Sequence, residues 1–100
     1  MKMETNGETL RITSVQQLGE ANANAFRAWV RGAFSNDHRN IEVDLAQTTF
    51  VDSCGLGALI GLHKAALSRK GKLVLLNPQP SIEQILELTR LDGVFEIVRR

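Results

Sequence analysis

The chain has 100 residues, of which 43% are hydrophobic and 23% are charged, and its formal net charge is +1. A chain of this size can bury one hydrophobic core and is too short for two, so we expect a single domain over residues 1–100. The basic residues are scattered along the chain, which argues against a nucleic-acid-binding protein, because such proteins gather Lys and Arg on one face.

The first element expected along the chain is a hairpin. The pair Asn6-Gly7 lies between two short extended segments, residues 2–5 and 8–13. Asn-Gly is a strong signal for a two-residue turn between antiparallel strands. The N-terminus therefore predicts a small antiparallel edge of a sheet.

A helix is expected from Ala21 to Phe34. Its apolar residues recur at helical spacing and share one face, whereas Arg27 and Arg31 lie on another face. That apolar face carries Phe26, Trp29, Val30, Ala33 and Phe34. Because Trp29 stands in the centre of this stripe, we expect its side chain in the core.

Three segments after the polar loop 35–40 are expected to form strands. Residues 41–45 alternate with period two, with Glu42 and Asp44 on the face opposite the apolar residues. The short apolar run Phe50-Val51 follows, and residues 73–76 form a further strand after a Lys70-Gly71 break. Strands that alternate with helices are typical of a mainly parallel sheet, because each parallel crossover needs a connecting helix.

The C-terminal part predicts a third helix and a last short strand. Ser81 and Gln84 have the spacing of a capping box, and Ile82, Ile85, Leu86 and Thr89 share a face behind them. Gly93 is expected to end the following turn, and residues 94–98 to add a strand. The whole pattern predicts an α/β fold with a mixed, mainly parallel sheet, interleaved helices and an N-terminal β-hairpin.

The segment Asp52-Ser53-Cys54-Gly55-Leu56-Gly57 places a hydroxyl where a strand passes into a helix. After it, Leu56, Leu59, Ile60, His63 and Leu67 recur at the spacing of one helix face, which predicts a helix to about Arg69 with Ser53 as its N-cap. A capping serine contributes about 1 kcal/mol. A second interpretation is a phosphorylation site, since a helix N-terminus favours a phosphate whereas the Asp52 carboxylate would repel it. Both interpretations fit the spacing.

Enzymatic interpretations of the same segment find little support. The nucleophile pattern Gly-x-Ser-x-Gly fails because Val51 occupies the first glycine position. His63 lies ten residues after Ser53 on the same predicted helix, about 15 Å along its axis. Cys54 lies next to a helix N-terminus, which can make a thiol reactive. The chain has no second cysteine to pair with it, so a redox role is the least favoured of the remaining interpretations. Gly55, Gly57 and Gly61 do not have the spacing of a phosphate-binding loop and indicate close approach of a neighbouring element or of a docking partner.

The remaining signals concern location and cofactors. A single cysteine cannot form an internal disulfide, which is compatible with a reducing compartment. The N-terminus lacks the apolar core of a signal peptide, and no stretch approaches the roughly 20 apolar residues that cross a bilayer. We therefore expect a cytoplasmic protein without membrane insertion, bound metal or cofactor.

From about Ile41 to Val98 the chain resembles the STAS domains, and among them the stand-alone anti-sigma factor antagonists of bacterial partner-switching systems. The resemblance rests on the two strands at 41–45 and 72–76, on Asp-Ser-x-Gly-Leu-Gly at 52–57, and on the closing segment 89–95. It implies the STAS fold, with the serine after the aspartate, Ser53, as the phosphoacceptor. It also implies partner binding by residues Asp52, Ser53, Cys54, Gly55, Leu56 and Gly57.

The resemblance further implies a protein-binding module rather than an enzyme. Its unphosphorylated form would bind an anti-sigma factor, a GHKL-type serine kinase, and so regulate transcription indirectly. Phosphorylation of Ser53 by that kinase would abolish the complex, and a serine phosphatase would restore it. The family's acidic Gly-x-Leu-Asp segment reads Gln16-Gln17-Leu18-Gly19 here, followed by Glu20. This difference leaves open a second role, a STAS scaffold subunit of a larger complex such as a lipid-transport ATPase.

Overall fold

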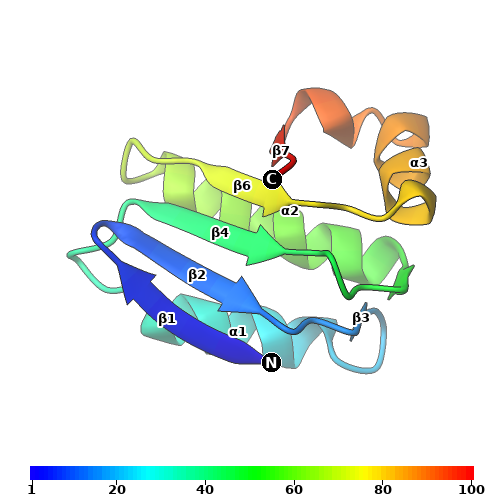
Figure 1. The fold of residues 1–100 in the computed structure, drawn as a ribbon. Helices are drawn as coiled ribbons and strands as arrows, with labels where there is room; N and C mark the ends of the chain where they lie inside the picture. Colours follow the sequence, from blue (N-terminus) through cyan, green and yellow to red (C-terminus); the bar gives the residue numbers. More distant parts are fainter.

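Two layers of secondary structure make up residues 1–100 in a computed structural model: a five-stranded sheet and, behind it, two of the three helices (Figure 1). The strand order is β1-β2-β4-β6-β7. These strands are β1 (Lys2–Asn6), β2 (Thr9–Thr13), β4 (Asn40–Asp44), β6 (Leu73–Leu76) and β7 (Glu96–Val98).

Three helices and one shorter turn connect the strands. The helices are α1 (Ala23–Ala33), α2 (Ser53–Leu67) and α3 (Pro80–Leu88), and a 3₁₀ turn, η1 (Leu91–Gly93), follows α3. In Figure 1, α1 and α2 run side by side behind the sheet, and α3 lies at the end where α2 begins. None of these helices is long and apolar enough to cross a membrane.

The sheet is mixed, as predicted. Strand β1 pairs antiparallel with β2, and the pairs β2–β4, β4–β6 and β6–β7 are all parallel. The predicted hairpin is confirmed, but its turn lies one residue later, at Gly7–Glu8, because Asn6 pairs with Thr9. Gly7 has φ +62°, a left-handed conformation that glycine adopts without steric cost.

The core lies between the sheet and the helices. On β4 the side chains of Ile41 and Val43 are fully buried, while Glu42 and Asp44 lie on the opposite, open face, as the period-two pattern predicts. All four residues of β6 are buried. Strand β7 covers only Glu96–Val98 of the predicted segment 94–98.

The buried face of α2 differs from the predicted one. Leu56 and Leu59 are buried as expected, but Leu67 is exposed. Leu62 and Ala66 take its place in the core. Apolar residues occur on every side of this helix, so the spacing alone could not decide which of them faces the sheet.

The capping box predicted at Ser81 and Gln84 does not form. Helix α3 begins two residues earlier than that box requires, at Pro80, and its N-cap is Gln79, which makes no side-chain capping hydrogen bond. Proline favours the first helical position because its fixed φ suits a helix and its missing N–H would have had no partner there. Pro80 therefore sets the start of the helix, and Ser81 becomes an exposed residue of its first turn.

Candidate functional site

A second, two-stranded sheet positions the segment that the sequence singles out. Strand β3 (Gln17–Leu18) pairs in parallel with β5 (Phe50–Val51). The sequence did not predict this pairing. Helix α2 begins two residues after β5 ends. The start of α2 is thereby held beside the loop that leads from β3 into α1.

Asp52, and not Ser53 as predicted, is the N-cap of α2. Its backbone is extended, with φ −113° and ψ −172°, and its Oδ1 accepts a hydrogen bond from the backbone N–H of Gly55 at 3.0 Å. Asp and Ser are about equally good N-caps, so the sequence could not tell which of the two adjacent residues would serve. The backbone of Asp52 directly follows β5. Its N–H donates a hydrogen bond to the carbonyl oxygen of Leu18, on the paired strand β3, at 3.3 Å.

This capping arrangement leaves the Ser53 hydroxyl free. Ser53 is the first residue of α2, its side chain is exposed, and its Oγ makes no hydrogen bond within the protein. Cys54 and Gly57 are also exposed, whereas Gly55 and Leu56 are buried. Of the six residues from Asp52 to Gly57, only some can therefore meet a partner directly, and the others shape the turn.

Asp52 also holds the neighbouring loop. Its Oδ2 accepts a hydrogen bond from the backbone N–H of Glu20 at 2.9 Å. Hydrogen bonds from the backbone N–H groups of Glu20 and Gly55 hold the pKa of Asp52 below the usual value for an aspartate, because they favour the ionised carboxylate. Sequence reasoning missed this contact, since the donor is a backbone group and leaves no side-chain signal.

The glycines of this region differ in whether a neighbouring atom leaves room for a side chain. A Cβ at Gly55 would lie 2.0 Å from the carbonyl oxygen of Leu18, so α2 crosses β3 at a distance that only glycine allows. At Gly61 a Cβ would lie 3.0 Å from Cδ of Arg27, which confirms close approach of a neighbouring element there. At Gly57 a Cβ would meet nothing within 4 Å, so packing within the protein does not account for this glycine.

Two hollows flank the exposed start of α2. One, of about 540 Å³, lies against β3 and β5 and is lined by Gln17, Gly19, Glu20, Ala21, Asn22, Phe50 and Asp52. The other, about 320 Å³, runs between α1 and α2, and we call it the α1/α2 groove. It is lined by Glu20, Ala23, Asn24, Arg27, Cys54, Gly57 and Ala58.

Neither histidine accompanies Ser53. His63 is partly buried on α2 and packs edge-on against the ring of Phe95, with the ring centroids 5.7 Å apart, as a helix-face residue should. His38 is buried in the loop before β4, where its Nδ1 accepts the Ser35 N–H at 3.0 Å. Because His38 precedes β4 and Phe50 follows it, His38 and Ser53 belong to opposite ends of the sheet. No Ser–His pair is formed.

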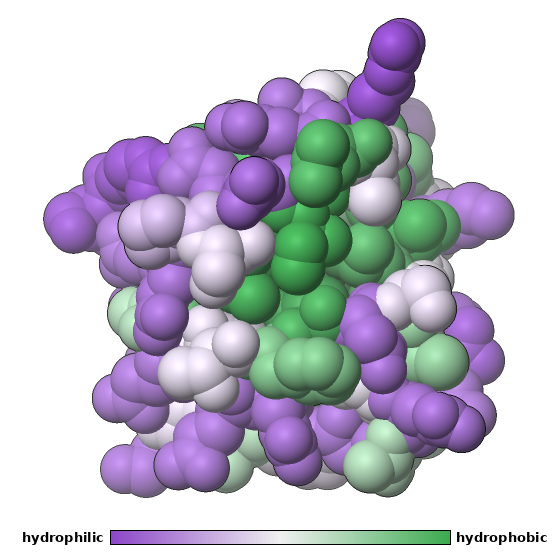
Figure 2. Space-filling model, turned by 90° about the vertical axis from the view of Figure 1, so that its right-hand side faces the viewer, coloured by the Kyte–Doolittle hydropathy of each residue, from purple (hydrophilic) through white to green (hydrophobic).

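Apolar surface gathers near the start of α2. Figure 2 shows an apolar band on the face of the molecule that carries α3 and the beginning of α2. Large exposed apolar side chains on these elements and on β5 include Leu88, which is 77% exposed, and Phe50, which is 51% exposed. Contiguous apolar surface of this kind is typical of protein–protein contact regions.

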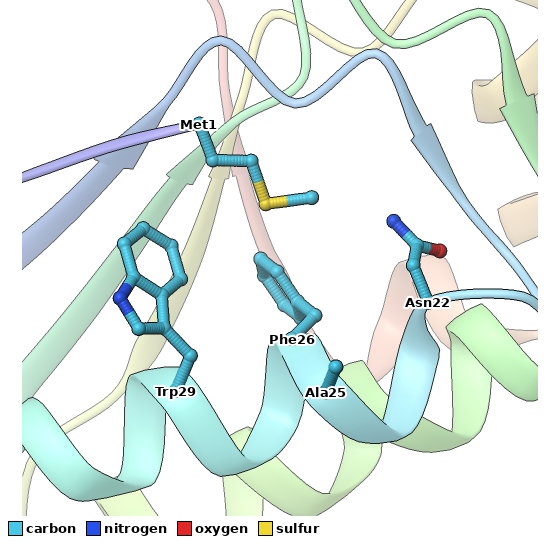
Figure 3. A pocket seen from close by; sticks show the side chains of 5 residues that line it. All are labelled: Met1, Asn22, Ala25, Phe26 and Trp29. Atoms are coloured by element: carbon cyan, nitrogen blue, oxygen red, sulfur yellow. The ribbon is translucent and has the colours of Figure 1, made fainter.

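Trp29 does not belong to the core, contrary to the prediction. Its side chain is 41% exposed, whereas Phe26 and Val30 of the same helix are buried. Trp29 lies three residues from Phe26, which places it about 60° to one side of the buried stripe. Figure 3 shows Trp29 and Phe26 pointing from α1 toward Met1 across a groove of about 330 Å³. The indole therefore covers the edge of the core.

Comparison with known proteins agrees with this architecture. A protein of Thermotoga maritima provisionally named an anti-sigma factor antagonist is 32% identical over 83 residues, which cover 82% of this chain and 74% of that protein. The crystal structure of an anti-sigma factor antagonist from Thermotoga maritima, also provisionally named, superposes with a TM-score of 0.90 at 26% identity, covering 99% of this chain and 85% of that one.

The fold also matches the anti-sigma factor antagonist SpoIIAA of Bacillus. The unphosphorylated form gives a TM-score of 0.86 at 23% identity, covering 99% of this chain and 86% of that one. The phosphorylated form gives 0.77 at 24% identity, covering 99% and 89%. At these identities the likeness concerns the fold alone. The family model described as the STAS domain matches residues 1–100. The chain belongs to the STAS domain family.

Proposed function

We propose that this chain is an anti-sigma factor antagonist whose affinity for its partner is set by phosphorylation of Ser53. The observation that carries the proposal is the free Ser53 hydroxyl, exposed on the first turn of α2 because Asp52 has taken over the capping role. The names of the related proteins, anti-sigma factor antagonists, point to the same function.

The partner in this proposal is an anti-sigma factor of the GHKL serine kinase type, which this chain binds in the cytoplasm when Ser53 is unphosphorylated. The exposed residues Ser53, Cys54 and Gly57 would meet the kinase, and Gly55 and Leu56 would shape the turn beneath them. Binding would withdraw the kinase from its sigma factor. This chain would then act by binding alone, and the ATP would belong to the kinase.

Phosphorylation would end the complex by electrostatics. The Ser53 Oγ attacks the γ-phosphorus of ATP, its proton passes to a base on the kinase, and the bond to ADP breaks. The new phosphate carries about −1.5 to −2 charges beside the Asp52 carboxylate. The free N–H groups of the first helical turn favour a phosphate, so the backbone need not move. The charge alone would then disfavour a docked partner, and a serine phosphatase would restore binding.

The proposal is tested by intact-mass measurement after incubation with ATP and each GHKL kinase encoded in the same genome. Wild type should gain the mass of one phosphate, and Ser53→Ala should gain none. Ser81→Ala is a matched control, because Ser81 is also an exposed serine in the first turn of a helix, α3. It should be phosphorylated like wild type.

The second candidate function is a scaffold subunit of a larger complex, such as a lipid-transport ATPase. It is favoured by the segment Gln16–Gly19, which lacks the aspartate that the antagonists carry before their first helix. In that role Ser53 would be a docking residue and would never be modified. Absence of phosphate after incubation with every cognate kinase would favour the scaffold over the switch.

A further inference from the structure

Charge is distributed unevenly between the two layers of the molecule. Helices α1 and α2 contain no aspartate or glutamate, and their charged residues Arg27, Arg31 and Lys64 are exposed and form no ion pair. On the open face of the sheet, by contrast, Glu42 and Asp44 are paired with Arg11 at 3.5 and 3.8 Å. The helical layer therefore carries positive charge that the protein does not itself neutralise.

Arg27 brings this charge to the site. It lines the α1/α2 groove together with Cys54 and Gly57, one and four residues beyond Ser53. The aliphatic part of its side chain lies over Gly61, where a Cβ would be 3.0 Å from Cδ. That contact restricts the side chain, so less conformational entropy is lost when the guanidinium binds a ligand. An arginine held in this way is suited to a carboxylate, which its planar fork can bind through two hydrogen bonds.

The floor of the groove is also unusual. Glycine inside a helix costs up to about 1 kcal/mol relative to alanine, so a helical glycine needs a reason. Leu18 supplies that reason for Gly55 and Arg27 for Gly61, whereas Gly57, like Gly32 far along α1, has no neighbour within 4 Å of a Cβ. Gly57 is exposed at the groove, where a bare backbone would let another chain come close.

We propose that the α1/α2 groove receives an acidic segment of the partner kinase, with a carboxylate of that segment bound to Arg27 and its backbone lying against Gly57. This inference rests on the function proposed above and adds the chemistry of the partner. It also gives the switch a physical basis. A phosphate on Ser53 would lie next to Cys54 and one helical turn before Gly57, both of which line the groove, and would repel the acidic segment.

The occupant is a protein segment rather than a nucleic acid. Only three basic residues lie on the two helices. Proteins with strongly salt-dependent DNA binding make about 6–10 phosphate contacts, two to three times the number of basic residues on this face. A narrow groove with an arginine at its side and a glycine on its floor fits one extended acidic segment better.

The first test measures the affinity of a cognate GHKL kinase for wild type and for Arg27→Glu. Reversing the charge should weaken binding by about 10-fold or more, because it sets like charges against each other. Lys2→Glu is the matched control, since Lys2 is exposed on β1, forms no ion pair and undergoes the same change of charge. It should bind within about 2-fold of wild type. Added salt should weaken binding of wild type more than binding of Arg27→Glu.

The second test adds a methyl group to the groove floor. Gly57→Ala should weaken kinase binding by about 5-fold or more, because overpacked contacts are costly. Gly32→Ala is the control, since Gly32 also lies in a helix where a Cβ would meet nothing within 4 Å, but far along α1 from Ser53. It should bind like wild type, so a loss that is confined to Gly57→Ala cannot come from altered helix stability.

The outcomes separate this inference from the proposed function. If a kinase binds wild type but not Ser53→Glu, while Arg27→Glu and Gly57→Ala bind like wild type, the inference is wrong and the function stands. If no kinase binds wild type, both fail. If duplex DNA binds wild type and Arg27→Glu abolishes that binding, the occupant is a nucleic acid, which also contradicts the inference.

Discussion

Glu20 donates its backbone N–H to Oδ2 of Asp52 at 2.9 Å, and this hydrogen bond joins the loop before α1 to the first turn of α2. The other carboxylate oxygen of Asp52 caps α2 through Gly55. One side chain thus holds the two segments that flank Ser53. Because both contacts favour the ionised carboxylate, the geometry around Ser53 is linked to the ionisation of Asp52.

This linkage predicts a pH dependence of stability. The pKa of Asp52 is lower in the folded protein than in the unfolded chain, so its carboxylate contributes stability above the unfolded value of about 4. That contribution is lost as the pH falls through the lower, folded-state pKa. Urea unfolding of wild type and Asp52→Asn should therefore differ most at neutral pH, and the difference should shrink below about pH 4. A difference that grows toward low pH would contradict this origin.

Two neighbouring glycines should respond to alanine in opposite directions. Gly55→Ala should lower the free energy of unfolding by about 3 kcal/mol or more, because the new Cβ would overlap the Leu18 carbonyl oxygen, which is a backbone atom and cannot move aside cheaply. Gly57→Ala should raise it by up to about 1 kcal/mol, since alanine is the better helix former and its methyl meets nothing. Equal effects in urea unfolding would show that α2 and β3 are not in this close contact.

The sequence predicted the hairpin, the mainly parallel sheet and the helix after Asp52, because each depends on a local pattern. Asn6-Gly7 lies within one residue of the turn, residues 41–45 alternate, and the apolar residues after Ser53 recur at helical spacing. The pairing of β3 with β5 could not be predicted. Each of these strands has two residues, which is too short for any periodicity, and they are joined only by the tertiary fold.

The sequence located the site, but it did not predict which residue of the site caps α2. Asp52 and Ser53 are adjacent and chemically similar as caps, and the choice between them was decided by where β5 ends. The α1/α2 groove was missed for a different reason. Its residues come from the loop before α1 and from two helices about 30 positions apart, and Arg27 looked like an ordinary residue of a solvated helix face.

The two aromatic residues of α1 should contribute unequally to stability. Phe26→Ala removes a side chain that is 3% exposed and should cost about 3–5 kcal/mol. Trp29→Ala removes one that is 41% exposed and should cost no more than about 2 kcal/mol. Because Trp29 is the single tryptophan, acrylamide should also quench the native fluorescence readily. A strongly protected indole would instead favour the core position that the sequence predicted.

The single cysteine offers a direct probe of docking. Cys54 is exposed and lines the α1/α2 groove, so a thiol reagent should label it in the native protein. A saturating amount of the cognate kinase should slow that labelling by about 10-fold or more, because the partner would cover the groove. Ser53→Glu should show no such protection. Undiminished labelling in the wild-type complex would mean that the kinase docks elsewhere.

The most direct test of the central claim is the dissociation constant of the kinase complex, measured for this chain before and after stoichiometric phosphorylation of Ser53. The account predicts that the phosphate weakens the complex by about 5- to 150-fold, in line with typical coupling energies of 1–3 kcal/mol. Removing the phosphate with a serine phosphatase should restore the original affinity. Equal dissociation constants for the two forms would contradict the account.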